Sequence, residues 1–170
     1  LLTSIMKTDV YSLSREATVE EAMRLFVEKN ISAAPIVDES GEPVGFISDG
    51  DILKRLSPRS NSFTDPIVLI NSTVNDDEGY DEKLAKVMQM RASEIGAASP
   101  ICVSVHANLT DVCRVLSENH LKKVPVLEAG HIVGIINRSD ITQYSMAAYL
   151  ADHPERAGQH ECVEEACEEC

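Results

Sequence analysis

Two heptads decide the fold of this chain: GFISDGD at residues 45–51 and GIINRSD at residues 134–140. Both keep a glycine, an isoleucine and an aspartate at the same three positions, and both follow a short apolar run. The sequence around them repeats as well. Residues 17–37 align with 107–127, and 41–53 align with 130–142 once one loop residue is dropped. Repetition of this kind indicates a duplicated supersecondary unit.

Both copies predict the same order of elements, β-α-β-β-α. A short extended stretch at 10–13 or 101–105 precedes a helix, which opens at Thr18 or Asn108 with an acid three residues later. Two strands and a turn follow, APIV with VGFIS in the first copy and VPVL with VGIIN in the second. A second helix follows each heptad's strand. Pro35 and Pro125 lack a backbone donor, so we expect them at a strand start or on an edge strand.

The predicted fold class is α+β, with two pseudo-symmetric repeats packed through their sheets around one shared aliphatic core. A single unit of about 50 residues buries too little surface to be secure alone. We expect the first repeat at 1–58 and the second at 91–150. The long connection at 59–90 should end in a helix at 81–90 that leads into the second repeat. The remaining residues, 151–170, form an acidic tail predicted to be disordered.

Composition and charge exclude several classes of function. The 170 residues carry 15 Lys and Arg against 28 Asp and Glu, and a net charge of −13 argues against nucleic acid. No run approaches the roughly 20 apolar residues of a membrane helix, and the first residues lack a signal peptide's apolar segment. Five cysteines, two of them in apolar periodic segments, suit reduced thiols in a cytosolic protein. The sequence contains no nucleophile elbow and no phosphate-binding loop of the kind that would predict an enzyme.

Each heptad has two interpretations. Ser48 with Asp51, and Asn137 with Asp140, form the capping box of an ordinary helix. The same pattern also suits a nucleoside phosphate, because a helix N-terminus attracts phosphate and a carboxylate can accept bonds from both ribose hydroxyls. Apolar strand residues alongside would hold a flat base.

Taken together, the two copies resemble a tandem pair of CBS domains, the module named after cystathionine β-synthase, over residues 5–56 and 92–145. In that family the pattern Gly-apolar-apolar-Ser/Thr-x-x-Asp marks an adenosine site. The resemblance implies that Asp51 and Asp140 bind ribose and that Ser48 contacts ribose or phosphate, whereas Asn137 departs from the Ser/Thr position. It also implies a homodimeric regulatory module, not an enzyme, that senses AMP, ADP, ATP or S-adenosylmethionine.

The resemblance extends to residues around the heptads. The family often places basic residues before the proline-containing strand, and Lys122 and Lys123 hold those positions in the second repeat. Arg138 stands at the second helix start, where the first repeat has Asp49. We therefore expect unequal sites, the second fitted to phosphate and the first to a neutral or cationic adenosine derivative. The base is expected against the segments 7–11 and 97–101 and the central strands, at Thr8, Val10, Ile36, Ala98, Pro100 and Val126.

The tail has a separate interpretation. Cys162, Cys167 and Cys170 follow His160 at C-x4-C-x2-C spacing, a set that could bind zinc or act as redox thiols. The alternative to nucleotide sensing is therefore a structural or interaction module with empty clefts and a metal-binding or redox tail. No catalytic cofactor is expected, and the C-terminal tail is the one segment where zinc could bind.

Overall fold

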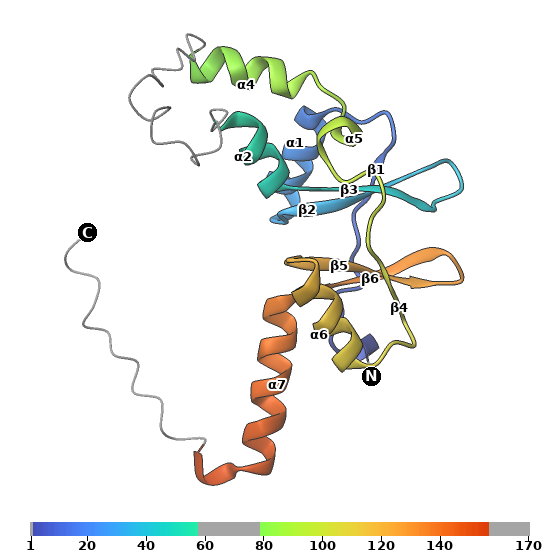
Figure 1. Ribbon diagram of the computed structural model, residues 1–170, viewed down its shortest axis with the longest axis vertical. Coiled ribbons are helices and arrows are strands. Elements are labelled where there is room, and N and C mark those ends of the chain that lie inside the picture. The colour runs from blue at the N-terminus through green and yellow to red at the C-terminus, as the bar shows by residue number, and fades with distance from the viewer. Residues whose placement is uncertain (1, 58–78, 157–170) are drawn as a thin grey trace, which may run out of the picture.

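The computed structural model describes residues 2–57 and 79–156, which fold as two units stacked one above the other (Figure 1). The first unit contains β1 (Leu13–Ser14), α1 (Val19–Lys29), β2 (Ala33–Val37), β3 (Pro43–Ser48) and α2 (Asp49–Leu56). The second contains β4 (Val103–Ser104), α6 (Leu109–Glu118), β5 (Lys123–Glu128), β6 (His131–Asn137) and α7 (Arg138–Asp152). The other elements are η1 (Leu2–Ser4), α4 (Tyr80–Met88), α5 (Ala92–Ile95) and η2 (Pro154–Arg156).

Each unit has a three-stranded sheet with its short first strand parallel to the middle strand and its third strand antiparallel to it. The two sheets face each other, and the helices that follow the strands lie on the outer sides (Figure 1). The predicted class, α+β with two pseudo-symmetric repeats packed through their sheets, is confirmed.

The prediction of one shared core is wrong. Buried side chains form two clusters, one in each repeat, because the helices of each repeat cover the outer face of its own sheet. Both clusters are aliphatic apart from Phe26 in the first. The first is centred on Val19, Ala22, Ile36, Ile47 and Ile52, and the second on Val112, Leu116, Val124, Val126 and Ile136.

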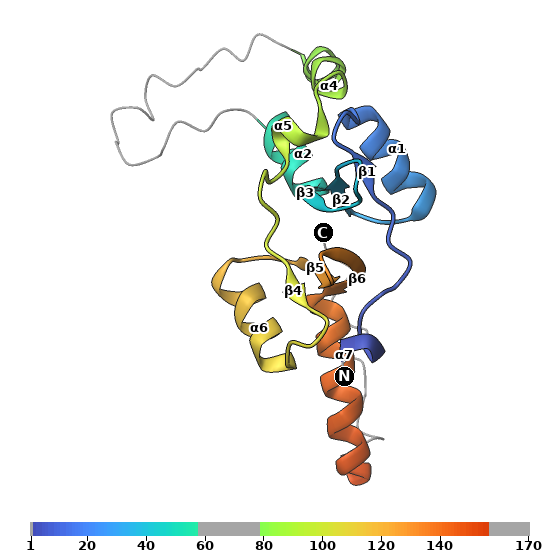
Figure 2. The same ribbon diagram turned by 90° about the vertical axis from the view of Figure 1, so that its right-hand side faces the viewer.

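The segment before each repeat packs on the opposite repeat. Leu2, only 1% exposed, lies in the second core, whereas Val87 of α4 and Ala92 of α5 lie in the first. In Figures 1 and 2 the two segments run in opposite directions between the units. We call residues 2–9 the first arm and residues 92–100 the second arm. The helix expected at 81–90 exists as α4, but it packs on the first repeat before the chain reaches the second.

Backbone hydrogen bonds fix both arms at equivalent positions. Lys7 of the first arm exchanges two bonds with Ile135 of β6, each 2.9 Å long. Ala97 of the second arm does the same with Phe46 of β3, at 2.8 and 3.0 Å. Both strand residues directly follow the glycine of a heptad. Each third strand is therefore paired on both of its edges, once with its own sheet and once with an arm.

The arms explain why both heptads begin with glycine. A Cβ on Gly134 would lie 2.6 Å from Met6 Sδ and 3.1 Å from the Lys7 carbonyl oxygen. A Cβ on Gly45 would lie 3.1 Å from the Ala97 carbonyl oxygen. Glycine at these positions allows an arm to approach the strand closely, which is a common reason for glycine inside a strand.

The prolines do not stand where we expected them. Pro35 and Pro125 lie inside the middle strands β2 and β5, opposite Phe46 and Ile135. Because Phe46 and Ile135 turn their N–H and C=O groups to the arms, the facing prolines occupy non-hydrogen-bonded pairs of the antiparallel ladder. On the other side, β1 and β4 pair only with residues beyond the prolines. A missing donor therefore costs no ladder bond at either position.

The close approach of the second arm gives a stability prediction. A Cβ on Gly96 would lie 2.5 Å from the Phe46 carbonyl oxygen, so Gly96→Ala should lower the free energy of unfolding by about 2 kcal/mol. Gly50 lies inside α2 with its nearest outside atom 3.6 Å away. Gly50→Ala should instead raise the unfolding free energy by about 0.5–1 kcal/mol. Chemical denaturation of both variants tests this; a neutral Gly96→Ala would mean that the second arm is not held against β3.

Candidate functional site

A pocket of about 350 Å³ lies between the two repeats. This volume falls within the range of small-molecule sites in proteins. We call it the inter-repeat pocket. Its lining comes from the first arm, the residues between that arm and β1, the loop after α1, and strands of both sheets. The lining residues are Lys7, Asp9, Tyr11, Asn30, Ile31, Ser32, Ala33, Lys123, Ile135 and Asn137.

The aspartate of each heptad accepts two hydrogen bonds at the start of its own helix. Asp51 Oδ2 accepts from Ser48 N at 2.8 Å and Ser48 Oγ at 2.7 Å. Asp140 Oδ2 accepts from Asn137 N at 3.1 Å and Asn137 Nδ2 at 2.7 Å. The capping interpretation is therefore correct for both. It does not exclude a ligand, because a carboxylate has a second oxygen. Asp140 is not part of the pocket lining, but its Oδ1 lies 3.9 Å from Nζ of the lining residue Lys7.

Two lysines bring positive charge to the pocket. Lys7 enters from the first arm, and Lys123 enters from the first residue of β5. Lys123 Nζ donates to Ser32 Oγ at 2.7 Å, a bond that joins the two repeats. Burial lowers the pKa of Lys123, and Asp49 and Asp140 oppose that shift while Lys7 adds to it. An anionic ligand would stabilise this half-buried ammonium as Asp49 and Asp140 do.

Asn137 has an unmatched acceptor at the pocket. Its Nδ2 must point to Asp140, so Oδ1 points the other way, where it is buried without a hydrogen-bond partner among residues 2–57 and 79–156. Such a group costs about 1–3 kcal/mol and is rare in folded proteins, so it calls for an explanation. Ser48, the equivalent residue, has no second polar atom and leaves none unmatched.

Several predicted base contacts lie elsewhere. In the first arm and the approach to β1, the pocket is lined by Lys7, Asp9 and Tyr11, and not by Thr8 and Val10. A tight turn, in which Val10 N donates to Thr8 O at 2.9 Å, sets this register. The aliphatic residues of the lining are Ile31, Ala33 and Ile135, and Tyr11 adds an aromatic ring.

Ile36 and Val126 were also expected beside a base, but both are fully buried within the two cores. They shape the sheets and have no surface to offer a ligand in this structure. Their opposite partners in the ladders are Gly45 and Gly134, and the Gly45 Cβ position is 3.3 Å from the Ile36 side chain.

Arg138 also lies outside the pocket lining. Its guanidinium donates to the carbonyl oxygens of Leu121 and, at 3.1 Å, Leu116, which lie just beyond and within the last turn of α6. Lys122 is exposed, and its backbone carbonyl accepts from Arg138 N at 3.0 Å. Of the three basic residues singled out in the second repeat, the structure brings only Lys123 to the pocket.

The first heptad has an equivalent setting. The second arm pairs beside Phe46, two residues before Ser48, and carries Ala98 and Pro100 onward from that bridge. Ala98 is exposed and Pro100 is half-buried. The first arm places Lys7 beside Ile135, two residues before Asn137, and the second arm places Ala97 beside Phe46, two residues before Ser48. The positive charge that the first arm supplies therefore has no counterpart from the second arm.

Comparison with known proteins follows the same division of the chain. The family model described as the CBS domain matches residues 2–58 and 92–147, about two thirds of the chain. The chain belongs to the CBS domain family. Each match includes one arm, one sheet and one heptad, so each CBS repeat begins with the arm that it lends to the other.

Among curated proteins, the chain is 28% identical over 143 residues to the chloroplastic CBS domain-containing protein CBSX1 of Arabidopsis thaliana. That alignment covers 82% of this chain and 61% of CBSX1, and CBSX2 of the same plant gives 26% identity with 60% of its length covered. This CBS pair thus spans about three fifths of the length of these relatives.

Solved structures share the fold. CBSX2 in complex with AMP has a TM-score of 0.63 at 23% identity, with 85% of this chain and 94% of that chain covered. The CBS domain pair of MJ0100, in complex with 5′-methylthioadenosine and S-adenosyl-L-methionine, has a TM-score of 0.65 at 22% identity. The alignment with MJ0100 covers 87% of this chain and 97% of that chain.

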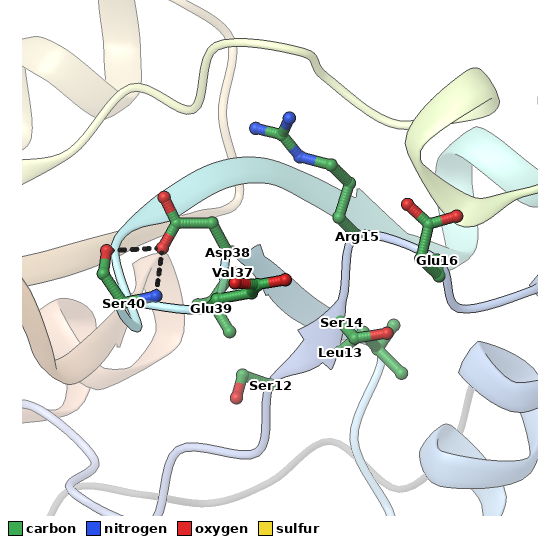
Figure 3. Close-up of a pocket in the computed structure, with 9 residues that line it drawn as sticks. All are labelled: Ser12, Leu13, Ser14, Arg15, Glu16, Val37, Asp38, Glu39 and Ser40. Atoms are coloured by element: carbon green, nitrogen blue, oxygen red, sulfur yellow. Dashed lines mark hydrogen bonds between the residues drawn. The ribbon is translucent and has the colours of Figure 1, made fainter.

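A larger hollow of about 690 Å³ lies on the first CBS repeat, and no heptad residue lines it (Figure 3). Residues 12–16 and 37–40 line it. Its Asp38 is already used within the β2–β3 turn, accepting from Ser40 N at 2.9 Å and Ser40 Oγ at 2.6 Å. The hydroxyl of Ser40 is the main cause that lowers the pKa of Asp38. We therefore place the candidate site in the smaller inter-repeat pocket.

Other predicted features are tested only in part. In the described ranges, no three His, Cys, Asp or Glu side chains form a group that could hold a metal. The possible ligands His160, Cys162, Cys167 and Cys170 lie outside those ranges. Burial raises the pKa of the Cys102 thiol. Within residues 2–57 and 79–156, no helix has the length and apolar character needed to cross a membrane.

The difference between Asn137 and Ser48 predicts how the second CBS repeat responds to a serine. In Asn137→Ser, the hydroxyl can donate to Asp140 as Ser48 does to Asp51, and the buried acceptor disappears. The free energy of unfolding should rise by about 1 kcal/mol. Chemical denaturation tests this, with Ser48→Asn as the reciprocal variant expected to lose stability. A less stable Asn137→Ser would show that Oδ1 has a partner in solution.

Proposed function

We propose that this CBS pair is a regulatory module that binds an adenosine-containing nucleotide in the inter-repeat pocket. The observation that carries the proposal is the meeting of Lys7 and Lys123 with Asn137 of the second heptad in one pocket. In this proposal Asp140 binds the ribose through Oδ1, and the two ammonium groups bind phosphate. Tyr11 and Ile31 provide surface for the base.

The charges favour a phosphate-bearing ligand in this pocket. A phosphate brought near Lys7 and Lys123 gains charge-assisted hydrogen bonds, which are about twice as strong as neutral ones. The first heptad has no arm lysine beside it, because the second arm carries Ala97 at the position of Lys7. We propose that a site there takes a neutral or cationic adenosine derivative such as S-adenosylmethionine, with Ser48, Asp51, Ala98 and Pro100 at its edges.

The mechanism of regulation is a shift between two arrangements of the repeats. The pocket is lined by both repeats, so a ligand there contacts surfaces whose relative position can change. A ligand moves such an equilibrium only by its difference in affinity for the two arrangements. The solved relatives described above were obtained with AMP and with adenosyl compounds, which agrees with this ligand class. Family members are generally regulatory, and we propose no catalytic step and no catalytic cofactor for this chain.

Titration calorimetry with AMP, ADP, ATP and S-adenosylmethionine tests the proposal. We expect saturable binding of at least one phosphate-bearing ligand, and a loss of about tenfold to a hundredfold in affinity for Asp140→Ala. Asp51→Ala should affect only the site proposed at the first heptad and leave this binding in place. The same four titrations on each variant separate the two sites.

Each of these variants also loses a helix cap, so a matched control is needed. Asp111 accepts from Asn108 Nδ2 at 2.6 Å at the start of α6, which is the side-chain bond that Asp140 accepts from Asn137, and it also pairs with Arg114 at 2.7 Å. It lies outside both heptads. Asp111→Ala should lose similar stability and keep its affinity. If none of the four ligands binds the unaltered protein, the heptads are helix caps alone and the proposal fails.

We also propose that the module is a homodimer in which α7 contacts a second copy. Only Ile141 of this helix is buried, and Met146 and Tyr149 expose 43% and 41% of their surface. Figures 1 and 2 show α7 extending well beyond the sheets. The resemblance to the CBS family implies a homodimer that associates through its helices.

Sedimentation velocity tests the dimer. The double variant Met146→Asp, Tyr149→Asp should sediment as a monomer. Burying two carboxylates without partners in the dimer interface would cost more free energy than the α7 contact provides. Tyr80→Asp, at an exposed residue of α4, is the control and should stay dimeric. A monomeric unaltered protein, or a dimeric double variant, would contradict this proposal.

A further inference from the structure

One side-chain hydrogen bond crosses from the second sheet to the first repeat at the inter-repeat pocket. Lys123 stands at the start of β5, opposite Asn137 in the ladder, and its Nζ reaches Ser32 Oγ at 2.7 Å. Both residues line the pocket. The same ammonium is therefore available to the first repeat and to anything that enters the pocket.

On the first-repeat side, this bond leads directly to the first heptad. The backbone carbonyl of Ser32 accepts from Asp49 N at 2.9 Å, and Asp49 is the first residue of α2. The Asp49 carboxylate also favours the charged form of Lys123. The bond to Ser32 thus holds the ammonium on the side of the first repeat, where Asp49 attracts it, while Asp140 attracts it from the second repeat.

The arrangement occurs once and not twice. Under the internal repeat, Lys123 corresponds to Ala33 and Ser32 corresponds to Lys122. Ala33 is buried and cannot form such a bond. The Lys123–Ser32 contact therefore has no counterpart at the repeat-related position, and any effect it has on ligand binding concerns the inter-repeat pocket.

We propose that the Lys123–Ser32 bond is an inter-repeat latch, which an anionic group in the pocket opens by competing with Ser32 for the ammonium. This inference rests on the proposed function, since it assumes that a nucleotide enters the pocket. Opening the latch removes a polar tie between the repeats at the beginning of α2. It connects phosphate binding to the relative position of the repeats, whereas a ligand without phosphate leaves the latch closed.

The latch has a measurable consequence for affinity. A protein whose binding-competent form is only partly populated shows an apparent affinity reduced by that fraction. Removing the competing hydroxyl should therefore tighten phosphate binding. We expect Ser32→Ala to bind AMP roughly fivefold more tightly, the lower end of the range for coupling between sites. Asp49→Asn should change affinity in the same direction, because it removes the second attraction for Lys123.

The test compares AMP with adenosine, which lacks the phosphate, by titration calorimetry on four proteins: unaltered, Ser32→Ala, Lys123→Met, and the double variant. Ser32→Ala should tighten AMP and leave adenosine unchanged. Lys123→Met should weaken AMP at least tenfold and spare adenosine. In the double variant the benefit of Ser32→Ala should vanish, because no ammonium remains to compete for. Lys54→Met on the exposed side of α2 controls for the lost charge.

The possible failures are distinguishable. If neither AMP nor adenosine binds the unaltered protein, the proposed function is wrong, and the latch proposal, which assumes nucleotide binding, is wrong as well. If AMP binds and Ser32→Ala leaves its affinity unchanged, or tightens adenosine equally, the pocket binds nucleotide but the latch does not exist. A benefit of Ser32→Ala that persists without Lys123 would also overturn the latch.

Discussion

The structure depends on two short backbone pairings, Lys7 with Ile135 and Ala97 with Phe46. Each joins an arm to the third strand of the opposite repeat, and the other features adapt to them. The heptad glycines leave room for the arms. The prolines are tolerated in the middle strands because the facing residues turn their polar groups to the arms. Leu2 and Ala92 complete the cores on which the arms lie.

The same pairings place the candidate site. By crossing to β6, the first arm carries Lys7 next to the heptad of the other repeat, where Asp140 is held by its cap. Capping and ligand binding are compatible uses of one carboxylate, because the cap uses a single oxygen and fixes the direction of the other. Lys123 adds to the charge of Lys7, whereas at the first heptad the equivalent residues of the repeat and of the arm are Ala33 and Ala97.

Much of this could be predicted from the sequence. The repeat and its periodicity identified the order of elements, the helix starts and the two heptads, because these depend on neighbours within a few residues. The register of the arm could not be predicted, since the turn at Asp9 that presents Lys7, Asp9 and Tyr11 has no repeat partner to reveal it. Lys122, Lys123 and Arg138 looked equally suited to phosphate. Only the fold in space shows that Arg138 serves the end of α6.

The exchanged arms also bear on how such a chain can arise. Leu2 and Ala92 are equivalent positions, each buried in the repeat to which its arm does not belong by sequence. A chain with one repeat would have no opposite repeat on which to lay its arm, and would have to lend it to a second chain. Two such chains would form a swapped pair. The tandem protein has that pair within a single polypeptide, so its two halves meet at a fixed one-to-one ratio however dilute the protein is.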